Sequence, residues 1–302
     1  MNDSRRGLML GVAAYTLWGA FPLYFPLLAP SGPVEILAHR IVWSAATMAL
    51  LVLVLRRGSA LRAILRDRRT AGLLVVAAAT ITLNWGTYIY GVNSGRVVEA
   101  SLGYFINPLV TVLMGVLILS ERLRRLQWVA LGVGVVAVLV LTLDYGRPPW
   151  VALVLAFSFG SYGLAKKKAD VGAVESLAAE TALIAPLALG YLVWLGSAGQ
   201  AHFASEGAGH VALLISTGIV TAVPLLCFGA AATRISMTSL GLLQYLTPVL
   251  QFTLGVTLLG EHMPTQRWIG FALVWVALII FTAEALGGRR RQLALVAESS
   301  AT

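Results

Sequence analysis

About ten apolar runs of roughly 18 to 22 residues divide this chain, each long enough to cross a hydrocarbon core of about 30 Å. Charged residues rarely interrupt them, and the whole sequence is 58% hydrophobic and only 12% charged. In lipid every backbone N–H and C=O must find a partner within the protein, so runs of this length form helices. We therefore predict an all-α polytopic membrane protein with spans at 7–28, 34–55, 71–92, 98–119, 126–143, 148–165, 174–196, 210–231, 237–259 and 267–286.

The basic residues lie mainly on one side of these predicted spans, and the formal net charge is +9. One side receives the clusters at 5–6, 56–69, 122–125, 166–168 and 289–291 together with Arg234, and the other receives Arg96, Arg147 and Arg267. Cytoplasmic loops carry the excess of lysine and arginine, which predicts cytoplasmic N- and C-termini and a place in the inner membrane. The clusters are better explained as contacts with the lipid bilayer than with nucleic acid, which is not a predicted partner.

The second half of the chain repeats the first half at a constant spacing. The matching residues are Pro108 with Pro248, Glu121 with Glu261, and Arg40 with Glu180. An odd number of spans in each copy forces the two copies into opposite orientations, a pattern typical of secondary transporters. We predict a first five-helix repeat at 7–143, an inverted second repeat at 148–286 and a cytoplasmic tail at 287–302. The two matching glutamates, at equivalent helix ends, are predicted to cap helices or pair loops.

Several polar strings within the apolar runs resemble a known family. The longest reads Glu99-Ala-Ser-Leu-Gly-Tyr-Phe-Ile-Asn-Pro-Leu109, and the others lie at 35–40, 84–85, 121–122, 156–164, 223–228 and 244–245. They resemble the EamA family of the drug/metabolite transporter superfamily and, within it, the RarD branch of chloramphenicol-sensitivity proteins. The resemblance implies a ten-helix inner-membrane permease for a small-molecule solute. It implies little about which solute, because members of the family carry diverse metabolites and drugs.

Two prolines, Pro108 and Pro248, fall near the middle of predicted spans. Proline lacks an N–H and clashes with the carbonyl four residues back, so each helix kink frees a carbonyl at mid-membrane depth. With the amide and aromatic residues of the spans, the kinks predict a substrate cavity whose aromatic wall would suit a flat or cationic solute. The predicted lining is Trp18, Asn84, Trp85, Tyr88, Tyr104, Asn107, Tyr162, Gln244 and Tyr245. The alternative is that neighbouring helices satisfy the kinks and that the rings pack as core.

Charged groups inside two spans are candidates for gates. Arg40 lies next to His39 near the outer end of one span, and Glu180 lies about as deep from the inner surface in another. Separated by roughly 15 Å in height, the two charges are too far apart to pair with each other. We expect Arg40 to pair with Glu99 at the outer mouth and Glu180 with Arg234 at the inner mouth. The alternative is that each charge snorkels or pairs only for folding.

No nucleotide-binding loop, metal-ligand motif or nucleophile–base pair occurs in the sequence, so an enzyme is not predicted, nor is a cofactor or metal. The single cysteine, Cys227, cannot form an intramolecular disulfide. The predicted function is a secondary-active permease working by alternating access, with efflux as the expected direction. The alternative is a passive channel or facilitator, or a membrane receptor. Proton coupling and a homodimer are both compatible with the pattern.

Overall fold

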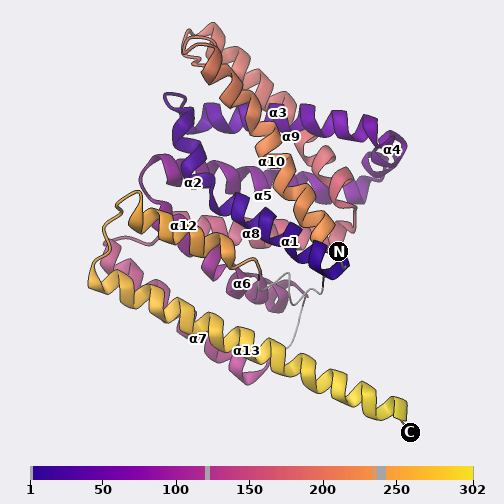
Figure 1. Cartoon of the computed structure of the whole chain (residues 1–302), viewed down its shortest axis with the longest axis vertical. Helices are drawn as coiled ribbons and strands as arrows, with labels where there is room; N and C mark the ends of the chain where they lie inside the picture. The colour runs from indigo at the N-terminus through magenta and orange to yellow at the C-terminus, as the bar shows by residue number, and fades with distance from the viewer. Residues whose placement is uncertain (1–2, 120–122, 233, 236–242, 302) are drawn as a thin grey trace.

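The computed structural model describes residues 3–119, 123–232, 234–235 and 243–301, and every regular element among them is a helix (Figure 1). In chain order they are α1 (Asp3–Gly19), α2 (Phe21–Tyr24), the 3-10 helix η1 (Phe25–Leu28), α3 (Pro33–Val54), α4 (Gly58–Arg66), α5 (Arg68–Asn93), α6 (Val97–Leu119), α7 (Arg125–Tyr145), α8 (Trp150–Ala169), α9 (Ala173–Ser197), α10 (Ala208–Ala232), α12 (Leu246–Thr257) and α13 (Thr265–Ala301). The all-α membrane fold predicted from the apolar runs is confirmed.

Seven of the described helices are long and apolar enough to cross a membrane by themselves. An eighth span results if α1 and the segment Phe21–Leu28, which meet at a bend of 42°, are taken together. Two further apolar helices, Trp150–Lys166 and Leu246–Thr257, are shorter. Each predicted range thus contains a helix, while the number of full spans stays a prediction.

The first predicted span, 7–28, is broken rather than continuous. Pro22 and Pro26 fall in the first turns of α2 and η1. A proline has no N–H to donate and clashes with the turn before it, so it ends one helix and begins the next. The break turns the rings of Phe21 and Phe25 towards α5, where both contact the ring of Tyr88.

Three other boundaries differ from the sequence prediction. Helix α4 forms within 56–70, which the sequence indicates only as a polar connection. The last helix continues to Ala301 through the predicted tail, where several good helix formers follow one another. The first part of the predicted span 237–259 lies outside the described residues, and α12 begins at Leu246. Pro248 therefore lies in the first turn of α12, not in mid-helix, while Pro108 is inside the continuous helix α6.

The helices pack as neighbours that are often distant in sequence. Helix α7 lies along α13, α8 packs on α5 and α6, α3 packs on α9 and α10, and α1 packs on α10 and α12. A Cβ atom added at Gly103 of α6 would lie 2.7 Å from the carbonyl oxygen of Ala152, and Gly218 of α10 meets the backbone of Trp43 in the same way. Such small residues let membrane helices approach closely. The contacts gather α3, α5, α6, α8 and α10 around the polar residues described below.

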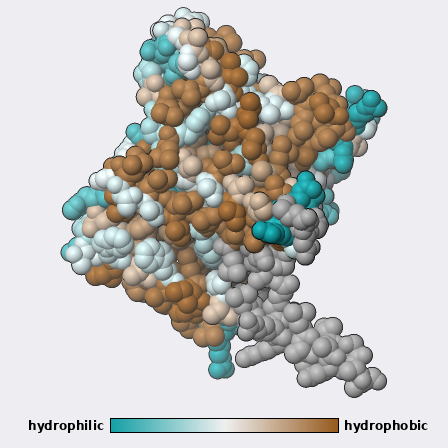
Figure 2. Space-filling model, viewed as in Figure 1, coloured by the Kyte–Doolittle hydropathy of each residue, from teal (hydrophilic) through white to brown (hydrophobic). Residues whose placement is uncertain are grey.

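The ends and the surface of the bundle agree with a membrane setting. Both termini and the basic helix α4 lie at the same end of the long helices (Figure 1). Apolar side chains cover much of the face seen in Figure 2, and large exposed hydrophobic residues include Leu139, Leu143, Leu187 and Ile279. In a protein that crosses a bilayer, such a surface contacts lipid rather than water.

Candidate functional site

Arg40 lies inside the bundle, on α3, and is only 4% exposed. Its Nε donates a hydrogen bond of 3.0 Å to Oγ1 of Thr221 on α10. Its guanidinium carbon lies 4.2 Å from the ring centroid of Trp85, 5.5 Å from that of Phe21 and 5.7 Å from that of Phe25. Its Nη1 is buried and has no partner among the described residues. Three aromatic rings and one hydroxyl thus surround a buried cation.

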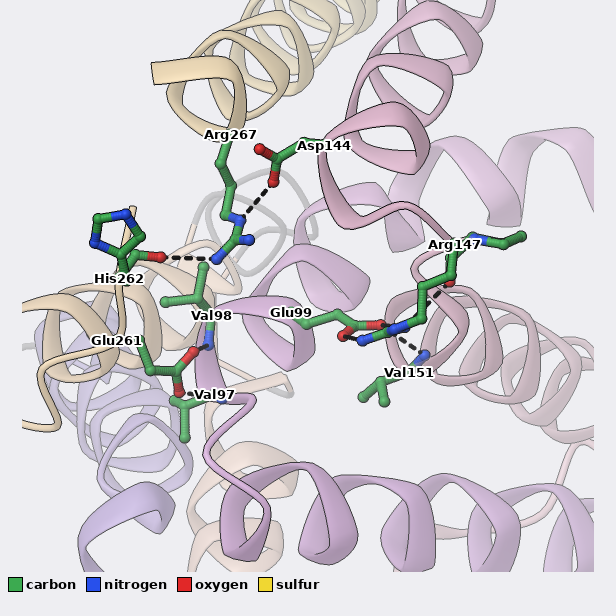
Figure 3. A network of polar contacts seen from close by, with 10 residues as sticks. Val97, Val98, Glu99, Asp144, Arg147, Val151, Glu261, His262 and Arg267 are labelled. Atoms are coloured by element: carbon green, nitrogen blue, oxygen red, sulfur yellow. Dashed lines mark hydrogen bonds and ion pairs between the residues drawn. The ribbon is translucent and has the colours of Figure 1, made fainter. Parts of the chain in front are cut away.

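The predicted pair between Arg40 and Glu99 is not formed, which corrects the sequence prediction. Glu99, at the start of α6, accepts hydrogen bonds from Arg147 at 2.8 and 3.3 Å and from the backbone N–H of Val151 at 3.1 Å (Figure 3). Arg147 lies in the short connection before α8, directly beside the first turn of α6. Its side chain reaches the carboxylate from outside the bundle, whereas Arg40 is turned towards α5 and α10. The bond to Glu99 raises the pKa of Arg147 further above its ordinary value.

Further polar contacts tie the loops at this end of the bundle together (Figure 3). Glu261, between α12 and α13, accepts the backbone N–H groups of Val97 and Val98, the latter at 3.0 Å, and so caps α6. The capping role predicted for Glu261 is confirmed, while Glu121 lies outside the described residues. Burial raises the pKa of the Glu261 carboxyl, and the two N–H groups partly offset this effect. Arg267 pairs with Asp144 at 2.9 Å.

Glu180 pairs with Lys166 rather than with Arg234, which is a second correction. The Glu180 side chain on α9 is 1% exposed, and its carboxylate lies 2.9 Å from Nζ of Lys166, which is 24% exposed. Ser176 and Tyr162 donate to the same carboxylate at 2.6 and 3.2 Å. Lys166 lies in the last turns of α8 and faces the start of α9 across a tight connection. Arg234 instead donates to the carbonyl of Ala230 at 2.7 Å.

An aromatic chain connects the two buried charges. Tyr88 follows the rings beside Arg40, and its centroid lies 5.8 Å from that of Tyr104. Tyr104 is followed by Phe159 at 6.3 Å, and Phe159 by Tyr162 at 5.9 Å. The hydroxyl of Tyr162 then donates to Glu180. This aromatic chain, from Tyr88 to Tyr162, runs through α5, α6 and α8 and is the candidate functional site.

Asn84 supports the aromatic chain from the side and is itself fixed in a helix interface. Its amide nitrogen donates to the carbonyl of Leu155 at 2.9 Å and to Oγ of Ser158 at 3.1 Å, both on α8. Its oxygen accepts the hydroxyl of Tyr104 at 3.3 Å. Asn84 therefore holds α5 against α8 and orients one ring of the chain, so its role is closer to packing than to the cavity lining that the sequence predicts.

The other predicted lining residues are dispersed. The ring of Trp18 contacts Tyr15 edge-on and Phe228 at a tilt, between α1 and α10. Gln244 and Tyr245 precede α12, and Tyr245 packs on the core around α6, α7 and α13. The side-chain oxygen of Asn107 is buried without a partner among the described residues.

His39 points away from the aromatic chain. Its ring stacks on Phe203 at 4.7 Å between centroids, and neither ring nitrogen has a partner among the described residues.

A groove of about 790 Å³ lies between the η1–α3 connection and the end of α5. Pro26, Ser31, Leu37, Tyr90 and Asn93 are among its lining residues. None of the nine predicted cavity residues lines this groove, because the break at Ala20 and the cap of α3 at Gly32 place loop residues there instead.

The EamA-like transporter family matches the chain twice, over residues 5–143 and 148–283. The chain belongs to this family. Protein RarD of Streptomyces exfoliatus is 57% identical over 100% of this chain and 96% of its own length. Protein RarD of Escherichia coli is 42% identical over 96% of this chain and 98% of its own length. These relatives confirm the resemblance to the RarD branch and show a multi-pass membrane transporter of the drug/metabolite type.

A solved crystal structure of a protein with 19% sequence identity has the same fold as this EamA chain. Its TM-score is 0.60, and the match covers 91% of this chain and 96% of the other. At this level of identity the likeness extends to the arrangement of helices and not to the residues of the aromatic chain.

Sequence reasoning on this EamA chain missed Phe21, Phe25, Phe159, Lys166 and Arg147 as parts of the candidate site. The three phenylalanines have no feature that separates them from ordinary core residues. The two basic residues were assigned to membrane topology, although each lies within one turn of a helix end that faces a buried acid. Closeness to a predicted helix end is a signal that the sequence contains, whereas the acid that each residue faces is set by the tertiary structure.

Replacing Asn84 by leucine is expected to destabilise the protein by about 1–3 kcal/mol, because the hydroxyls of Ser158 and Tyr104 lose a buried partner. The measurement is the thermal unfolding midpoint in detergent. Thr80→Val is the matched control, since the hydroxyl of Thr80 bonds only the carbonyls of its own helix. Equal midpoints for both variants would contradict the role given to Asn84.

Proposed function

We propose that the protein is a secondary-active permease that moves a small metabolite or drug-like solute across the inner membrane by alternating access. Efflux is the proposed net direction. The single observation that carries this proposal is the aromatic chain between two buried charges, which begins beside Arg40 and ends at Glu180. A buried charge inside a bilayer is costly, so two such charges joined by three tyrosines and a phenylalanine point to a solute path.

The proposed architecture is two inverted five-helix repeats, 7–143 and 148–286, with both termini in the cytoplasm. Two features support it: the family matches the chain over two segments with similar bounds, and the termini lie with the basic helix α4 at one end of the bundle (Figure 1). A reporter enzyme fused after Gly287 tests the orientation. Activity of a reporter that works only in the periplasm would contradict it.

The proposed gates are the two buried ion pairs that replace the predicted ones. Glu99 with Arg147 closes the outer mouth, and Glu180 with Lys166 closes the inner mouth. Each pair joins α8 to a different neighbour, because Arg147 precedes α8 and Lys166 ends it. A tilt of α8 against α6 and α9 would therefore break one pair while it closes the other, as alternating access requires.

Counterflow in proteoliposomes tests transport against the alternative of a channel or receptor. Vesicles preloaded with unlabelled solute are given traces of labelled amino acids, aromatic acids and amides, or phenicols. A permease accumulates label transiently and saturably, whereas a channel only equilibrates it and a receptor moves none. Trp128→Leu, an exposed change on α7, is the matched control. Repeating the assay with an imposed pH gradient tests proton coupling, and the direction of net flux tests efflux.

A further inference from the structure

The buried cation of Arg40 has no counter-charge among the described residues. No ion pair forms with it, and Thr221, its one hydrogen-bond partner, is neutral. The acids in the described ion pairs are already engaged: Glu35, Glu99, Asp144, Glu175, Glu180 and Glu284. A charge in such a place is costly unless an opposite charge or water joins it. Glu180, at the equivalent position of the second repeat, pairs with Lys166. Arg40 in the first repeat has no such partner among the described residues.

Two residues with unused donors lie beside the same two rings, those of Phe21 and Phe25. Nε of Arg40 is bound, but Nη1 is free, and the buried hydroxyl of Tyr88 also has no partner among the described residues. The guanidinium carbon lies over the ring of Trp85 at 4.2 Å, which leaves the unpartnered Nη1 as the donor for a ligand. A planar edge with two N–H groups matches a carboxylate, which it can bind with two parallel hydrogen bonds.

We infer that Arg40 binds the carboxylate of the transported solute and that the rings around it hold an apolar, flat part, which makes the substrate a small aromatic or otherwise planar organic acid. This inference rests on the proposed function and names its substrate class. The sequence by itself is compatible with a cationic solute, because aromatic rings attract cations. A buried arginine in the site would repel a cation, so an anionic solute is proposed instead. Loss of the solute on release leaves Arg40 held by the rings and by Thr221 without a counter-charge, a state that favours binding of the next anion.

The test compares acids with their neutral amides. The full-length protein in detergent is titrated with phenylacetate and indoleacetate, and with phenylacetamide and indoleacetamide, while thermal unfolding is followed. We expect both acids to raise the unfolding midpoint and to bind at least about tenfold more tightly than the amides, which corresponds to one charge-assisted bond. Amides that bind as well as the acids, or acids that bind no better than buffer, would overturn the inference.

Variants of the site separate recognition from packing. Arg40→Gln should remove the preference for acids, and Arg40→Lys should keep part of it, because a point charge lacks the two-pronged edge. Tyr88→Phe keeps the ring and should weaken acid binding a few-fold, so it tests the site even if Arg40→Gln does not fold. Arg62→Gln removes an exposed charge of α4 and should change nothing. An acid preference that survives in Arg40→Gln and Tyr88→Phe would show that the guanidinium only locks helices together through its aromatic contacts.

The same ligands in counterflow distinguish this inference from the proposed function. Saturable exchange of neutral or cationic solutes, without competition from either acid, would reject the acid and leave the permease intact. Acid binding in detergent without exchange of any solute would reject the permease and leave the binding site intact.

Discussion

Replacing Lys166 by methionine should destabilise the protein more than replacing Lys166 and Glu180 together. The single change leaves a carboxylate that is 1% exposed with only Ser176 and Tyr162 as neutral donors. Removing one partner of a buried pair costs about 3–5 kcal/mol, and the partial exposure of Lys166 favours the lower end of this range. The double variant Lys166→Met with Glu180→Gln has no orphaned charge. Thermal unfolding in detergent and the yield of folded protein measure both effects.

Arg234 provides the control for this double-mutant cycle, since the depth of both residues in the predicted spans had paired it with Glu180. Arg234→Ala combined with Glu180→Gln is expected to be additive within about 0.5 kcal/mol, because no contact among the described residues joins Arg234 to Glu180. Coupling of Glu180 to Arg234 and not to Lys166 would contradict the inner gate proposed above. If the pair is a gate, the charge-swapped variant Lys166→Glu with Glu180→Lys should also recover part of the exchange activity.

Replacing Arg147 by methionine should destabilise the protein by about 3 kcal/mol or more, whereas Glu99→Gln should cost about 1–3 kcal/mol. The asymmetry follows from burial, since the side chain of Glu99 is 2% exposed and that of Arg147 is 35% exposed. Without Arg147 the carboxylate is left in the bundle with only the N–H of Val151, but without Glu99 the guanidinium can turn into water. Unfolding midpoints of the two single variants and the double variant give the comparison.

The pair of Arg124 with Glu284 is the matched control for this asymmetry. It has a similar N···O distance, 2.8 Å, but its arginine side chain is 59% exposed. Arg124→Met should therefore cost less than Arg147→Met, because the Glu284 side chain is 10% exposed and that of Glu99 only 2%. If Arg124→Met and Arg147→Met were equally destabilising, or if Glu99→Gln were the more harmful change at the outer end, burial would not be what makes the Glu99 pair strong.

The sequence by itself determined where the helices lie and what kind of protein they build. Lipid leaves the backbone one solution for a long apolar run, so each of the predicted ranges contains a helix regardless of tertiary contacts. The polar strings shared with the EamA family could also be recognised from the sequence, because each is a short run of consecutive residues. Even the break near Ala20 was encoded, in Pro22 and Pro26, because proline acts on its own turn. The cap at Glu261 followed from its place at a helix end.

Only the tertiary structure decided which side chains meet. The partner of a buried charge depends on how each helix is rotated and on which neighbour lies at the same depth, and neither quantity is carried by spacing along one chain. Depth along the spans predicted Glu99 for Arg40 and Arg234 for Glu180, but α8 brings Arg147 to Glu99 and Lys166 to Glu180 from its two ends. Arg40 is thereby left among aromatic rings without a protein acid. Arg40 has no acidic partner among the described residues because side-chain packing, and not the position of the apolar runs, decides which acid each basic residue reaches.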